Sequence, residues 1–176
     1  MPRTRVDTRA EIRAVAAELF ARQGFEKTSL REVAERLDIT KAALYYHFPS
    51  KADLVRGIVQ PFVDEVEALL ADREAAADVD ARQFLADYFD VVLRYRQVFE
   101  MILRDVSAIA ELDLMRQMLA WRDRTYVLLV GPGASPAQIA RATVAIGGLQ
   151  DCATTEGPAE EFRDAALEAA VAALRS

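Results

Sequence analysis

Residues 29–48 have the sequence SLREVAERLDITKAALYYHF, and the order of polar and apolar residues in this stretch decides the fold. Ser29 and Glu32 have the spacing of a capping box at a helix start. The apolar residues that follow recur at helical spacing: Leu30, Val33, Ala34 and Leu37. Thr40 can cap a second helix, and Pro49 ends it because the residue before a proline avoids helical conformation. The stretch therefore predicts two short helices joined by a tight turn.

Such a pair is typical of a helix-turn-helix, whose second helix enters the major groove of DNA. Lys41 can donate to guanine acceptors, and Ala42 can contact the methyl group of thymine. Tyr45, Tyr46 and His47 offer donors to phosphate, and the sequence leaves open which tyrosine is partly buried. The residues that we expect to contact DNA are Thr28, Ser29, Arg31, Thr40, Lys41, Ala42, Tyr45, Tyr46, His47 and Lys51.

The formal net charge of −6 is distributed unevenly along the 176 residues. Residues 1–51 hold ten Lys or Arg against seven Asp or Glu, whereas residues 52–176 hold twelve against twenty-one. A basic head on an acidic body indicates that the head meets an anion. Arg3, Arg5 and Arg9 form a basic arm that could reach the DNA backbone or the minor groove.

A longer pattern surrounds the two helices and includes the string LYYHFPSK at residues 44–51. Its other members are Phe20, Gly24, Thr28, Ser29, Val33, Ala34, Leu37, Ile39, Thr40, Lys41, Ala43 and Leu54. Together, over about residues 8–56, they resemble the DNA-binding head of TetR-family transcriptional repressors. One departure is Asp38, where the family more often has glycine in the turn. Because Asp tolerates a left-handed backbone better than most residues, we expect the turn to form.

The whole chain predicts an all-α protein of about nine helices. We expect Thr8 to open the first helix and Gly24 to end it. A long helix is expected at 50–75, with Pro61 kinking or splitting it. The remaining helices are expected at about 80–95, 98–108, 111–130, 136–155 and 158–174.

The charge changes sign near residue 50, so we expect a helix-turn-helix DNA-binding domain at 1–50 and a helical effector-binding and dimerisation domain at 51–176. Small residues on the last two expected helices allow close helix packing between two copies. The expected homodimer interface comprises Ile139, Thr143, Ile146, Gly147, Phe162, Ala166, Ala169, Ala170 and Ala173. Packing within one chain is the alternative. A dimer would place two recognition helices about 34–36 Å apart on a pseudo-palindromic site.

The resemblance also implies a cavity for a small-molecule effector among the central helices. Aromatic and thioether side chains recur there at helical spacing, and Arg104 could meet an anionic ligand. The candidate effector-binding residues are Phe62, Tyr88, Val92, Tyr95, Phe99, Arg104, Met118 and Trp121. The same stripes could equally be ordinary core, and the sequence leaves both interpretations open.

The resulting hypothesis is a transcriptional repressor that binds a palindromic operator as a homodimer and is released by a small molecule. The alternatives are a transcriptional activator and an architectural DNA-binding protein that needs no effector. The single cysteine, Cys152, excludes a zinc site of several cysteines, and the single histidine, His47, argues against a Ser-His-Asp triad. We expect no enzyme activity, cofactor or metal. Neither a signal peptide nor an apolar run of about 18 residues is present, which predicts a cytoplasmic protein without a membrane span.

Overall fold

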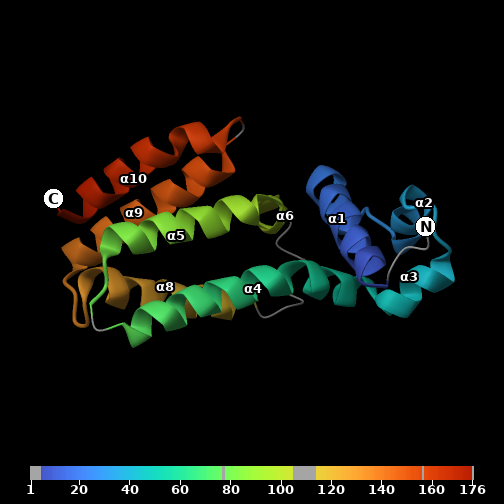
Figure 1. Ribbon diagram of the computed structural model, residues 1–176, viewed down its shortest axis with the longest axis horizontal. Helices are drawn as coiled ribbons and strands as arrows, with labels where there is room; N and C mark the ends of the chain where they lie inside the picture. Colours follow the sequence, from blue (N-terminus) through green and yellow to red (C-terminus); the bar gives the residue numbers. More distant parts are fainter. Residues whose placement is uncertain (1–4, 77, 105–113, 156, 176) are drawn as a thin grey trace. The chain divides into compact units, whose positions relative to one another are not determined.

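The computed structural model describes residues 5–76, 78–104, 114–155 and 157–175, and every regular element in these ranges is a helix (Figure 1). The helices are α1 (Arg5–Gln23), α2 (Leu30–Arg36), α3 (Lys41–His47), α4 (Lys51–Ala75), α5 (Ala81–Arg94), α6 (Arg96–Arg104), α8 (Leu114–Val130), α9 (Pro136–Thr154) and α10 (Ala159–Arg175). The prediction of an all-α protein is confirmed. The expected helices at 98–108 and 111–130 extend into 105–113, which lie outside the described residues.

Contacts between the helices divide the chain into two compact units. The first unit contains residues 1–62 and 97–114, and the second contains 63–96 and 115–176. Helix α4 contributes residues to both units, since the division falls between Phe62 and Val63.

The first unit packs α1, α2, α3 and the beginning of α4 around a shared apolar core. Its fully buried side chains include Ile12, Phe20, Val33, Leu44, Phe48 and Leu54. Helix α1 ends at Gly24, which has φ 89° and donates its N–H to the carbonyl of Phe20. The expected start at Thr8 is wrong, because α1 begins one turn earlier at Arg5 and no helix-breaking residue lies between the two positions.

Helix α4 is continuous over 25 residues and includes Pro61. Of the two outcomes expected at Pro61, a kink or a split, the split does not occur. Buried residues on both sides of the proline, among them Ile58 and Phe62, hold one face of α4 in apolar surroundings. This packing offsets the backbone hydrogen bond that a proline removes.

The second unit contains α5, α8, α9, α10 and the rest of α4. Helix α9 begins as expected, with Ser135 accepting from the N–H of Gln138 in a capping box and Pro136 in the first turn. Helices α9 and α10 lie side by side, and both pack against α5 (Figure 1). A two-bond ion pair joins α10 to α5, with Arg163 donating to both carboxylate oxygens of Asp90 at 2.8 Å. Among the described residues, none of the helices has the length and apolar character needed to cross a membrane.

Candidate nucleic-acid interface

The turn between α2 and α3 holds the two helices in a fixed crossing. Asp38 has a left-handed backbone with φ 51°, as expected for the residue that replaces glycine at this turn. The N–H of Ile39 donates to the carbonyl of Ala34 at 3.0 Å, and Leu44 of α3 is fully buried. The buried side of α3 is thus fixed against the unit, which leaves its other side facing solvent.

A hydroxyl residue caps each of the two helices. The Ser29 hydroxyl oxygen accepts from the N–H of Glu32 at 3.1 Å, and the Thr40 hydroxyl oxygen accepts from the N–H of Ala43 at 3.1 Å. Both residues are exposed. A hydroxyl that accepts one hydrogen bond retains its own hydrogen, so each cap can still donate to a phosphate oxygen.

The exposed face of α3 presents one cation, one methyl group and two phenols. Lys41 and Ala42 are exposed, and the side chains of Tyr45 and Tyr46 are 40% and 64% exposed. Neither tyrosine is buried, which answers the question that the sequence left open. His47 is half-buried, and its ring meets that of Tyr46 edge to face at 5.4 Å between centroids.

Two further candidates are engaged in contacts within the unit. Thr28 is 2% exposed, and its hydroxyl donates to the carbonyl of Gly24 at 2.9 Å. The Arg31 guanidinium is exposed and donates to Glu35 at 2.7 Å, and this hydrogen bond raises the pKa of Arg31 above its ordinary value. Thr28 therefore supports the end of α1, whereas Arg31 could exchange a carboxylate for a phosphate.

Lys51 lies in the first turn of α4, whose start is capped by Ser50. The Lys51 ammonium lies 4.1 Å from the centre of the Phe25 ring and donates to the carbonyl of Glu26 at 3.3 Å. The Ser50 hydroxyl oxygen accepts from the N–H of Asp53 at 3.0 Å. These contacts hold a positive charge at a helix start, where backbone amides also favour an anion.

The comparisons with known proteins agree with this geometry. The sequence model of bacterial regulatory proteins of the tetR family matches residues 12–58, a range that holds α2, α3 and the start of α4. Residues 12–58 of the chain therefore match the tetR family. The resemblance noted in the sequence is confirmed.

Relatives that this chain matches are transcriptional regulators by name. The chain is 30% identical over 118 residues to the HTH-type transcriptional regulator AcrR of Shigella flexneri, covering 63% of this chain and 55% of that protein. It is 38% identical over 58 residues to the HTH-type transcriptional repressor KstR2 of Rhodococcus jostii (strain RHA1), covering 33% and 28%. The chain thus spans about half the length of the first relative and less of the second.

A solved structure shares the fold over nearly the whole chain. A transcriptional regulator from Aquifex aeolicus VF5 superposes with a TM-score of 0.72 at 20% identity, covering 92% of this chain and 96% of that one. At this identity the likeness shows the fold alone.

The candidate effector-binding residues fall into both units. In the first unit, Phe62 and Phe99 are buried and meet edge to face, with ring centroids 4.9 Å apart. In the second unit, Val92 and Trp121 are buried, whereas three candidates are half-buried: Tyr88, Tyr95 and Met118. The side chain of Arg104 lies outside the described residues.

Polar partners hold two of these aromatic side chains in place. Gln150 donates a hydrogen bond to the Tyr88 hydroxyl, and burial raises the pKa of Tyr88 above its ordinary value. The Trp121 indole N–H donates to Glu67 of α4. Both aromatic residues therefore have satisfied polar groups without a ligand.

The candidate interface residues lie on α9 and α10 with mixed exposure. Ile139, Thr143, Phe162 and Ala169 are exposed, Ile146, Gly147 and Ala173 are half-buried, and Ala166 and Ala170 are buried. A shallow crevice of about 150 Å³ between the two helices is lined by small and apolar residues: Val144, Ala145, Gly148, Leu149, Cys152, Ala166, Ala169, Ala170 and Ala173. Val144 is 65% exposed at its edge. The two helices together present an apolar surface of small side chains.

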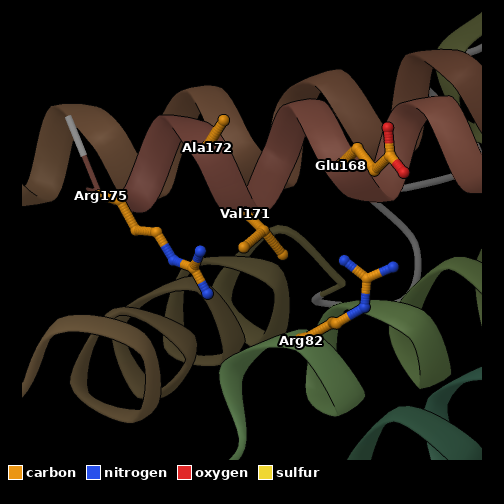
Figure 2. A pocket seen from close by; sticks show the side chains of 5 residues that line it. All are labelled: Arg82, Glu168, Val171, Ala172 and Arg175. Carbon is orange, nitrogen blue, oxygen red and sulfur yellow. The ribbon is translucent and has the colours of Figure 1, made fainter.

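A larger hollow of about 440 Å³ lies on a different side of α10, where α10 faces the first turn of α5. Figure 2 shows Arg82 and Arg175 on either side of it, with Val171 pointing into the space between them. Glu168 and Ala172 complete the lining. None of the candidate effector-binding residues whose side chains the structure describes lines this hollow or the crevice.

The sequence reasoning did not single out Gly57, which packs against the residue that ends α3. A Cβ atom at Gly57 would lie 2.7 Å from Cε1 of Phe48. The signal for this contact was a glycine inside a long apolar helical pattern, which often marks a close approach between chain segments.

Proposed function

We propose that this chain represses transcription as a homodimer that binds a palindromic operator through α3. The exposed face of α3 is the observation that supports this proposal. Lys41, Ala42, Tyr45 and Tyr46 face solvent on a helix whose opposite residue, Leu44, is fully buried. A helix anchored in this way can enter a major groove without disturbing the core of its own unit.

The proposed contacts divide into those that read bases and those that bind the backbone. Lys41 would donate to the acceptors of guanine, and Ala42 would contact the thymine methyl group. The capping hydroxyls of Ser29 and Thr40, together with Lys51, would donate to phosphate oxygens. Backbone contacts position the helix, and the contacts of α3 with bases supply sequence preference.

The proposed dimer forms through α9 and α10. The small residues of these helices, the crevice between them and the exposed side chains of Val144 and Phe162 support this assignment. An apolar surface shared by two helices can pair with its own copy in a four-helix arrangement. Two-fold symmetry then places one α3 helix on each half of a palindrome.

The proposed repressor role draws on the name of KstR2, a transcriptional repressor to which this chain is similar over 58 residues. Release by a small-molecule effector is part of the proposal because residues 12–58 match the tetR family, and the resemblance implies an effector. A coupling of about 1–3 kcal/mol between effector and DNA would change the DNA affinity roughly 5- to 150-fold.

Repeated selection from a library of random duplexes with the purified chain tests this function. The expected result is enrichment of an inverted repeat whose half-sites are centred about one helical turn apart, roughly 34–36 Å. Enrichment of single half-sites would refute the dimeric arrangement, and recovery of no preferred sequence would refute operator recognition.

A further inference from the structure

Gly57 of α4 lies closer to another residue than five other glycines do: Gly131, Gly133, Gly147, Gly148 and Gly157. A Cβ atom at Gly57 would lie 2.7 Å from Cε1 and 3.4 Å from Cζ of Phe48. Real Cβ contacts essentially never fall below 3.0 Å. At Gly147 and Gly148 of α9, by contrast, an added Cβ meets no atom within 4 Å.

Phe48 connects this contact to the recognition helix. It is the residue that ends α3, and its N–H donates to the carbonyl of Leu44 at 2.9 Å. Its side chain is 1% exposed, and the Arg9 guanidinium lies 5.0 Å from the centre of its ring. The ring is therefore enclosed and cannot turn toward solvent without exposing a large apolar surface.

Helix α1 also contacts Gly57 and Phe48. Arg13 donates from Nη1 to the carbonyl of Gly57 at 3.3 Å, and Arg9 stands one turn before it on α1. Two arginines of α1, a glycine of α4 and the terminal aromatic residue of α3 thus meet at one point of the first unit.

We propose that Gly57 is a positioning residue for α3: its missing side chain provides the seat in which Phe48 fixes the C-terminal end of the recognition helix. The inference rests on the proposed function of α3 as the DNA-reading helix and adds a residue that does not itself touch DNA. Because Gly57 lies on α4, the same contact makes the placement of α3 depend on the placement of α4.

The direction of the effect separates this inference from an ordinary glycine in a helix. Replacing a glycine inside a helix by alanine normally stabilises the helix, since alanine has the higher helix propensity. At Gly57 the added methyl group must displace the enclosed Phe48 ring, and overpacking of this kind is destabilising. Relief of the contact requires the Phe48 ring to shift, and Phe48 is the residue that ends α3.

Hydrogen–deuterium exchange of the free protein tests the seat without DNA. We expect Gly57→Ala to accelerate exchange at the amides of residues 44–48 while exchange in α9 and α10 stays as in the wild type. Asp72→Ala is the control, because it raises helix propensity at an exposed position of the same α4 helix and meets neither Phe48 nor Arg13. Unchanged exchange at residues 44–48 in Gly57→Ala would overturn the inference.

DNA binding provides the second readout, measured on a duplex enriched by the wild-type chain and on one random duplex. We expect Gly57→Ala to weaken binding to the enriched duplex about tenfold and to leave binding to the random duplex nearly unchanged. Loss of folding would lower both affinities together. The ratio of the affinity for the enriched duplex to the affinity for the random duplex therefore reports the positioning of α3. A ratio equal to that of the wild type would overturn the inference.

A compensating variant makes the test specific. Phe48→Leu removes the ring atoms that the new methyl group would meet, so Gly57→Ala should reduce the ratio less in the Phe48→Leu background than in the wild type. An equal reduction in both backgrounds would count against the proposed seat. If the wild-type chain enriches no duplex, the proposed function fails, and the exchange measurement alone then decides whether Gly57 seats Phe48.

Discussion

The ammonium group of Lys41 lies 5.4 Å from the centre of the Tyr45 ring, one helical turn further along α3. A cation over an aromatic face is held by the ring quadrupole, which limits the directions that the lysine side chain samples. Both side chains are exposed, so this pair lies on the side of α3 that the proposal places against DNA.

We expect Lys41→Ala to reduce affinity for the selected operator by about 1–3 kcal/mol, because it removes a donor to base acceptors. Tyr45→Phe should retain the ring beneath Lys41 and lose only the phenolic donor, so its loss should be smaller than that of Tyr45→Ala. Fluorescence anisotropy with a labelled operator measures both effects.

Arg82→Ala is the matched control for Lys41→Ala. It removes one positive charge from an exposed side chain in the second unit, on the hollow between α5 and α10 (Figure 2). Its operator affinity should equal that of the wild type. If Lys41→Ala and Arg82→Ala weaken binding equally, net charge rather than a contact of α3 is responsible.

The double variant Gly147→Glu and Ala169→Glu should convert the proposed dimer into monomers. An added Cβ at Gly147 meets no atom within 4 Å, and Ala169 is exposed, so each chain should still fold. Two buried carboxylates without partners would oppose association. Sedimentation velocity reports the change in mass.

Ala172→Glu provides the comparison on the same helix. Ala172 is exposed and lines the hollow rather than the crevice, so this variant should remain a dimer. A double variant that still sediments as a dimer would exclude the α9–α10 interface.

Arg124 of α8 joins two carboxylates of α4. It donates to Glu74 from Nε at 2.7 Å and from Nη2 at 2.9 Å, and it also donates to Glu67. The hydrogen bonds from Arg124 and Trp121 lower the pKa of Glu67, and the hydrogen bond from Arg124 lowers the pKa of Glu74. A carboxylate with a lowered pKa in the folded state stabilises that state above its ordinary pKa of about 4.3.

This stabilisation should be complete at neutral pH and should disappear as the pH falls through the lowered pKa values. Because the three side chains are partly exposed, we expect Glu67→Gln to cost roughly 1 kcal/mol or less at pH 7. The difference from the wild type should shrink in acid. Urea unfolding followed by the fluorescence of Trp121, the single tryptophan, measures it, and a difference independent of pH would contradict the assignment.

Local signals in the sequence were sufficient to predict the helix-turn-helix of the head and the helical content of the chain. The side chains of Ser29, Thr40 and Ser135 each accept from the N–H three residues further on, as predicted. At Ser29 the Glu32 carboxylate accepts from Gln23, so only the Ser29 half of the expected capping box is seen. Asp38 likewise adopts the expected left-handed turn. The exceptions are the start of α1, which lies before Thr8, and Pro61, where the packing of Ile58 and Phe62 keeps α4 continuous.

Features that depend on distant parts of the chain were not predictable in the same way. Thr28 carries a hydroxyl that was expected to contact phosphate, yet that hydroxyl donates to the carbonyl of Gly24 at the end of α1. The contact between Gly57 and Phe48 and the bonding of Trp121 to Glu67 join residues on different helices. Aromatic stripes at helical spacing have the same pattern whether they fill a core or line a cavity, so the effector-binding residues stay a prediction.

The most direct test of the central claim is the affinity of the purified chain for a random duplex between 50 and 200 mM salt. A basic head that binds phosphates releases counterions, so the logarithm of the binding constant should fall linearly with the logarithm of the salt concentration, with a slope of about −0.9 for each phosphate contact. Affinity that does not change with salt, or no binding at any salt concentration, would contradict the proposal that residues 1–51 form a DNA-binding head.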